Sequence, residues 1–179
     1  MEDLSLHILD IAENSIDAGA DLILIKIMDK ESEDKIILQI QDNGKGMDEE
    51  AIKKVKDPFY TTKSVRRFGM GIPFLAQAAE QCNGKILIDS TPTKGTNIIA
   101  EFQRSHIDRK PLGDIGSTMM VLIGGHPEID FLFLYESDIS SYKLDTRELK
   151  RELDSVPINL PEVLRLIKDD INEAIKGRI

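Results

Sequence analysis

The sequence predicts an α+β fold, because segments with helical periodicity and segments with strand periodicity both occur along the chain. Apolar residues recur at helical spacing over residues 4–18. Two β-branched runs, residues 21–29 and 35–42, are joined by the polar stretch KESED, which is typical of paired antiparallel strands. Two more strand-like runs follow at 85–90 and 96–102, separated by the turn sequence TPTKG.

Glycines mark the ends of these first elements. Gly19 is expected to end the first helix. The second strand runs directly into DNGKGM, and the two glycines within residues 43–46 predict a tight turn with positive backbone angles. The acidic stretch that follows predicts a short helix at 49–55, because carboxylates are favourable in a first helical turn.

A loop and a further helix are predicted between the two strand pairs. Residues 57–71 contain a proline and two glycines and are expected to form a loop. Residues 72–82 are predicted to be helical, with Pro73 in the first turn and Asn83-Gly84 after the last one.

The remainder of the chain is predicted to form a smaller α+β unit. A change of composition over residues 103–117 indicates a linker. Strands are predicted at 118–123 and 130–136. One helix is expected to start at Asp145, where D-x-x-E resembles a capping box, and another follows Pro161. We therefore expect two parts, residues 1–104 and 105–179.

Composition and charge narrow the classes of function. A formal net charge of −9 over 179 residues argues against general binding to nucleic acid or to anionic membranes. Cys82 is the only cysteine, which excludes an intramolecular disulfide. The acidic N-terminus does not resemble a signal peptide, and no apolar run approaches the ~20 residues of a membrane span. A cytoplasmic location is expected.

The first helix carries polar residues that suit a metal-assisted reaction. Asp10, Asn14 and Asp17 follow one another at four and three residues, so they share one stripe of the helix. An amide oxygen is a suitable ligand for Mg²⁺, and a carboxylate one turn away is a candidate base for an attacking water. A solvated acidic helix face explains the same pattern and is clearly favoured for this helix taken alone. Glu13 projects about 100° away from Asn14 around the helix.

Three loops add candidate ligand-binding groups. In DNGKGM, Asp42 is an acceptor for an amino group such as that of adenine, although the same letters also suit a hairpin turn. RRFGMGIP joins glycines to a helix N-terminus, a favourable place for phosphate, with Lys63, Arg66 and Arg67 just before it. A solvated surface loop is the alternative there. In STPTKGTNI, the Thr96 hydroxyl could reach a base or a water, although a β-turn is sufficient explanation.

The order of these segments resembles the GHKL superfamily of gyrase, the large heat-shock chaperone, sensor histidine kinases and MutL. ENSIDAGA resembles the N box, DNGKGM the G1 box, GMG the first part of the G2 box, and KGT the final glycine-threonine element. The resemblance covers about residues 4–103. It implies a Bergerat ATP-binding fold, a two-layer α/β sandwich with a mixed sheet covered on one face by helices.

The resemblance also implies which residues bind ATP and Mg²⁺. Asn14 stands at the Mg²⁺-ligand position and Asp42 at the adenine-recognition position. The residues expected to contact the nucleotide are Asn14, Asp17, Asp42, Gly44, Gly46, Met47, Lys63, Gly69, Met70, Gly71, Ile72 and Thr96.

Three departures from the family pattern shape the expected activity. Asp10 stands where gyrase and MutL have a glutamate, so it is the candidate catalytic base but its carboxylate is one methylene shorter. Only residues 64–68 separate TTK from GMG, so an ATP lid would be short. The N box begins almost at the start of the sequence, so the phosphoacceptor histidine that precedes it in sensor kinases is not expected here.

We therefore expect a regulatory Mg-ATP-binding protein that phosphorylates or switches a separate protein partner, still to be identified. A hydrolytic ATPase switch and a non-catalytic sensor of ATP and ADP are the alternatives, so the sequence leaves open whether it is an ATPase or a protein kinase. Residues 105–179 lie outside this resemblance. They are expected to pack on the ATP-binding part, to hold a partner or to form a homodimer.

Overall fold

A computed structural model of the chain describes residues 2–56 and 71–176. Their strands form one six-stranded sheet in the order β3-β4-β2-β1-β5-β6. All neighbouring strands are antiparallel except β1 and β5, which are parallel, so the sheet is mixed. The strands are β1 (Leu22–Lys30), β2 (Lys35–Asp42), β3 (Lys85–Thr91), β4 (Gly95–Gln103), β5 (Asp130–Ser137) and β6 (Ser141–Asp145).

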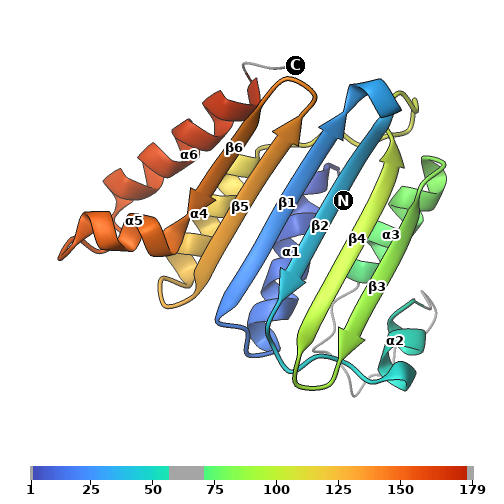
Figure 1. The fold of residues 1–179 in the computed structure, drawn as a ribbon, viewed down its shortest axis with the longest axis horizontal. Coiled ribbons are helices and arrows are strands. Elements are labelled where there is room, and N and C mark those ends of the chain that lie inside the picture. The colour runs from blue at the N-terminus through green and yellow to red at the C-terminus, as the bar shows by residue number, and fades with distance from the viewer. Residues whose placement is uncertain (1, 57–70, 177–179) are drawn as a thin grey trace.

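Helices α1, α3 and α4 lie behind one face of this sheet in Figure 1, and α6 packs against α4 at the side of β6. The predicted two-layer architecture is confirmed. The helices are α1 (Leu4–Asp17), α2 (Glu49–Lys56), α3 (Gly71–Gln81), α4 (Ile115–Gly125), α5 (Thr146–Leu153) and α6 (Pro161–Lys176), with a 3₁₀ turn, η1 (Glu31–Glu33). Within residues 2–56 and 71–176, no helix combines the length and apolar character that crossing a membrane requires.

Alternation along the strands creates the core between the two layers. Ile23, Ile25 and Ile27 of β1 are buried, while the residues between them are only partly covered. Phe131 and Phe133 of β5 repeat this pattern and are fully buried. Burying such a side chain contributes about 1.5–3 kcal/mol, so the helix-facing side of the sheet supplies much of the folding free energy.

The sheet continues across the predicted boundary at residue 104. Ile23 pairs with Phe131 and Ile27 with Tyr135 in the parallel register of β1 and β5. The segment before α4 is also attached to the first helix, because the backbone N–H groups of Leu4 and Ser5 donate to carbonyls in residues 111–112. The division into two domains stays a prediction, but the C-terminal part extends the sheet of the N-terminal part.

Two elements of the C-terminal part differ from the sequence prediction. The apolar run 118–123 is helical, within α4, and the predicted strand there is wrong. A short apolar run does not distinguish a buried strand from a buried helix. Asp114 marks the start of the helix as its N-cap residue, because its carboxylate accepts the backbone N–H of Ser117. Strand β6 was not predicted at all, because its five residues alternate too briefly to give a signal.

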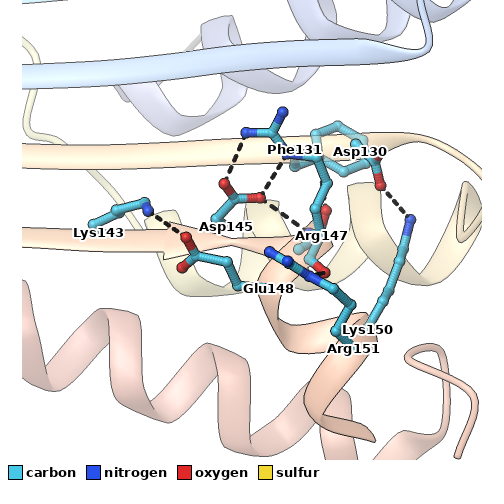
Figure 2. A network of polar contacts seen from close by, with 9 residues as sticks. Asp130, Phe131, Lys143, Asp145, Arg147, Glu148, Lys150 and Arg151 are labelled. Carbon is cyan, nitrogen blue, oxygen red and sulfur yellow. Dashed lines mark hydrogen bonds and ion pairs between the residues drawn. The ribbon is translucent and has the colours of Figure 1, made fainter. Parts of the chain in front are cut away.

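The predicted capping box at Asp145 is only half formed (Figure 2). Asp145 accepts the N–H of Arg147 at 3.0 Å and also binds its guanidinium through both carboxylate oxygens. Glu148 does not return to the Asp145 backbone, as a capping box requires, but pairs with Lys143 at 2.7 Å. Helix α5 is therefore held both to the edge strand β6 and to its neighbour β5, since Lys150 pairs with Asp130 of β5.

Acid should destabilise the fold through His7. This imidazole is 2% exposed and its Nδ1 has no hydrogen-bond partner within the described residues. Burial, together with nearby positive charge, lowers the pKa of His7 from 6.5 to about 4, although Asp3 acts in the opposite direction. Above pH 6.5 the group is neutral in both states and contributes nothing. As the pH falls from 6.5 to 4, only the unfolded chain takes up the proton, so about 3 kcal/mol of stability is lost.

Urea denaturation of the wild type and of His7→Leu at neutral pH and near pH 4 measures this loss. The wild type should lose about 3 kcal/mol more than the variant between the two conditions. Equal losses would show that His7 does not titrate differently in the two states.

Candidate functional site

Asp42, the last residue of β2, is the centre of a buried hydrogen-bond network. Its Oδ1 accepts the backbone N–H of Gly44 at 2.8 Å and that of Thr96 at 3.2 Å. Its Oδ2 accepts the hydroxyl of Ser15, from α1, at 2.7 Å. The residue is only 9% exposed. Because these three partners are all donors, the carboxylate is held in one orientation as an acceptor.

A second hydroxyl cluster continues this network toward β3. The Ser90 hydroxyl lies 2.9 Å from that of Thr96 and donates to the carbonyl of Gly95 at 2.9 Å. It also accepts the N–H of Met47 at 2.8 Å. The strand pair β3–β4 thereby holds the loop that follows Asp42, and Met47 is buried.

Two glycines bring three backbone segments together around Asp42. Gly46 has φ +65° and Gly95 has φ +89°, a region that side chains rarely adopt. A Cβ on Gly46 would overlap the Thr91 carbonyl oxygen, and one on Gly95 would overlap the carbonyl oxygen of Asp42. Gly44 was expected to have a positive angle as well, but only Gly46 does within residues 43–46.

The loop after β2 is fixed at both ends, and it is not a hairpin. The N–H of Lys45 donates to the carbonyl of Ala18 at 3.0 Å, and its carbonyl accepts the N–H of Thr93 at 2.7 Å. Asn43 accepts the N–H groups of Asp21 and Leu22 through its side-chain oxygen. Helix α2 rather than a strand follows this loop, so the hairpin alternative is wrong.

Asp10 lies against the first residue of α3. A Cβ on Gly71 would overlap the Asp10 carboxylate, so the glycine permits this approach. The pKa of Asp10 is raised above its ordinary value, mainly by burial and to a smaller extent by the negative charge of Glu13. A carboxylate thus faces the start of an 11-residue helix, where backbone N–H groups have no partner within the helix.

The other predicted residues on helices occupy different environments. Asn14 is half-buried, one turn after Asp10 on α1, while Asp17 is exposed at the end of that helix. Ile72 is buried in the core at 6% exposure, so its side chain is a packing residue. Glu13 points away as predicted, with its carboxylate 3.4 Å from Nε2 of His126 after α4.

The structure therefore brings Asp42, Gly44, Gly46, Met47 and Thr96 together, and it places Asp10 and Gly71 in contact at the helix side. Lys63, Gly69 and Met70 lie outside the described residues, as do Arg66 and Arg67. Sequence reasoning missed Ser15 and Ser90. Both hydroxyls stand inside or next to motifs that were noticed, but their role depends on which strands and helices become neighbours.

Removing the Ser15 hydroxyl should weaken the network. In Ser15→Ala, Oδ2 of Asp42 loses a charged, buried hydrogen bond, so we expect about 1–2 kcal/mol lower stability in chemical denaturation. Ser137→Ala, which removes a hydroxyl near the end of β5, should change stability by less than half as much. Equal effects of the two substitutions would contradict the central place of Ser15.

Comparison with known proteins relates this site to an ATPase family. Residues 2–106 match the family model of histidine kinase-, DNA gyrase B- and HSP90-like ATPases. Sporulation kinase E of Bacillus subtilis (strain 168) is 34% identical over 92 residues, 49% of this chain and 12% of that protein. The sensor histidine kinase YxdK of the same organism is 34% identical over 74 residues, 39% of this chain and 23% of that protein. The chain thus spans less than a quarter of either relative.

A solved structure extends the likeness beyond residue 106. The ATPase domain of Aquifex aeolicus MutL, solved in complex with ADP, aligns with 87% of this chain and 69% of its own, with a TM-score of 0.52 and 19% identity. At that identity the likeness concerns the fold alone.

Proposed function

Because the chain belongs to the family of histidine kinase-, DNA gyrase B- and HSP90-like ATPases, we propose that it binds Mg-ATP and uses it to phosphorylate or switch a separate protein partner. The observation that carries the proposal is the buried carboxylate of Asp42 with its three donors. The partner is a protein rather than a nucleic acid, since the chain has a formal net charge of −9. The proposed function also allows the chain to act as a homodimer.

The geometry around Asp42 fits an adenine base. Each carboxylate oxygen accepts about two hydrogen bonds, and among the described residues Oδ2 has one donor, the Ser15 hydroxyl. Its second acceptor position suits the exocyclic amino group of adenine. The glycines of the loop and of the β3–β4 turn let a flat base approach the backbone without meeting a Cβ.

The N-terminal end of α3 is the natural position for the phosphates. Its first backbone N–H groups attract an anion, and Gly71 adds no side chain there. Asn14 would hold Mg²⁺ through its amide oxygen, a ligand type that this ion accepts. Bound Mg²⁺ supplies charge neutralisation for phosphoryl transfer. Asp17, Lys63, Gly69, Met70 and Ile72 belong to the proposed site by motif alone.

The role of Asp10 determines whether ATP is hydrolysed or its phosphate is available for transfer to a partner. Asp10 is the carboxylate next to the proposed phosphate position, and its raised pKa makes it a better proton acceptor than an ordinary aspartate. If it orients and deprotonates a water, the chain is an ATPase whose cycle drives a conformational change. If it does not, binding of ATP in place of ADP can still switch a partner.

Incubation with γ-labelled ATP and Mg²⁺ separates these activities. The chain is tested alone and with purified candidate partners, such as proteins encoded beside it. We expect label on a partner and little free phosphate from the chain alone. Free phosphate that disappears in Asp10→Asn would support the hydrolytic ATPase instead.

Two results would narrow the proposal further. Tight binding of ATP without release or transfer of phosphate would favour the non-catalytic sensor. Absence of any binding would contradict the proposal itself. Glu162→Gln, which removes an exposed carboxylate on the distant helix α6, is the control for Asp10→Asn and should leave all activities unchanged.

A further inference from the structure

We propose that a cavity at the opposite end of β1 and β2 from Asp42 binds a small organic carboxylate through Arg109. The cavity has a volume of about 420 Å³ and lies between the β1–β2 end, the segment 104–114 and the last turns of α6. This volume is within the range of small-molecule sites. Its wall includes Ile36, Arg104, Arg109, Leu112, Asp114 and Ile175.

Arg109 supplies the positive charge. Its Nε donates to the carbonyl of Arg104 at 2.6 Å and its Nη1 to the carbonyl of Lys110 at 3.0 Å. These bonds hold the guanidinium in place but do not neutralise it. No carboxylate of residues 2–56 or 71–176 forms an ion pair with Arg109, although the side chain is half-buried. A partly buried cation without a counter-charge is an attractive position for an anion.

The acidic residues of the wall are already matched. Asp29 is only 8% exposed and pairs with Nε of Arg104 at 2.7 Å. Burial acts to raise the pKa of Asp114, but hydrogen bonds from Ser117 and Asn172 outweigh it and hold the pKa at about 2. Asp114 therefore stays ionised and bonded to its own partners. Neither carboxylate forms an ion pair with Arg109.

The remaining wall is apolar and defines the class of ligand. Ile36, Leu112 and Ile175 line the cavity together with Pro111. A ligand that fits this cavity has an anionic group beside Arg109 and an apolar body against these side chains. A small aromatic or branched carboxylate meets both requirements. Inorganic phosphate has the charge but no surface to bury against the apolar wall, so it should bind more weakly.

The cavity is built into the fold and is separate from the proposed nucleotide site. The carbonyls of Pro111 and Leu112 accept the N–H groups of Leu4 and Ser5, so the first turn of α1 holds this wall. Ile36 and Asp42 are six residues apart on β2, which places the two sites about 20 Å apart. The inference does not depend on the proposed function.

Titration with sodium benzoate, followed by ¹H–¹⁵N NMR of the full chain at constant ionic strength, tests the proposal. We expect saturable shifts at the Arg109 Nε–H and at the amides of Leu112 and Gly113, with a dissociation constant of about 1 mM or lower. Arg109→Gln should weaken benzoate binding at least tenfold, whereas Arg151→Gln on α5 should not change it. Equal shifts with inorganic phosphate would overturn the assignment to carboxylates.

A second variant keeps the test valid if Arg109→Gln lowers stability. Leu112→Trp should fill part of the cavity and also abolish the benzoate shifts, while the amides around Asp42 keep their positions in the spectrum. Shifts that rise linearly without saturation, or that persist in both variants, would show that the cavity binds no carboxylate.

Discussion

Gly95→Ala should lower the free energy of unfolding by about 3–5 kcal/mol, because two costs add at one position. The backbone of Gly95 has φ +89°, which an alanine adopts only with strain. A Cβ at that position would also overlap the carbonyl oxygen of Asp42 and approach Cα of Asn43. Since neither backbone segment can move without breaking the β2–β4 pairing, the strain cannot be relieved locally.

Gly19→Ala is the matched control. Gly19 has φ +78°, but a Cβ there would meet no heavy atom within 4 Å. This substitution should therefore cost only the backbone strain, about 1 kcal/mol. Chemical denaturation of both variants gives the comparison. If Gly95→Ala lowered the free energy of unfolding no more than Gly19→Ala does, the β3–β4 turn would not lie as close to Asp42 as described.

Asp42→Asn should weaken binding of ADP and ATP about 100-fold, a loss of about 3 kcal/mol. Oδ1 of the new amide can still accept from Gly44 and Thr96. The amide nitrogen would replace Oδ2 and donate to the Ser15 hydroxyl oxygen, whose own hydrogen would then turn to the carbonyl of Ile11, 3.2 Å away. The fold is therefore retained, but a donor now faces the amino group of adenine.

Calorimetric titration with Mg-ADP measures this effect. Asp89→Asn changes the net charge by the same amount on the exposed side of β3 and should leave the affinity within about twofold. A loss of equal size in both variants would assign the effect to net charge rather than to the contact at Asp42.

Most of the N-terminal half is predictable from the sequence because its signals are local. Alternating β-branched runs define β1 and β2, and Gly19 after α1 adopts the positive φ that the helix end required. The prediction from local sequence was wrong at 118–123, because this short apolar run could be buried equally well as a strand or as a helix. Only the Asp114 cap distinguishes them, and a single aspartate before an apolar run is a weak signal.

The site was predictable in its motifs but not in its supporting contacts. Asp42 and Thr96 stand in recognisable glycine-rich segments, and the antiparallel register of β2 and β4 places them opposite each other. Ser15 and Ser90 could not be assigned, because their roles depend on α1 and β3 reaching Asp42 from distant parts of the chain. The continuation of the sheet through β5 was equally hidden, since a parallel pair leaves no local trace of its partner.

The contact between Asp42 and an adenine amino group is the central claim, and a cross-titration tests it most directly. Mg-ADP and Mg-inosine diphosphate, which carries an oxygen in place of the amino group, are titrated into the wild type and into Asp42→Asn. The wild type should prefer ADP by about 100-fold, and the variant should lose or reverse that preference, because its amide donates where the carboxylate accepts. The same preference in both proteins would show that Asp42 does not contact the base.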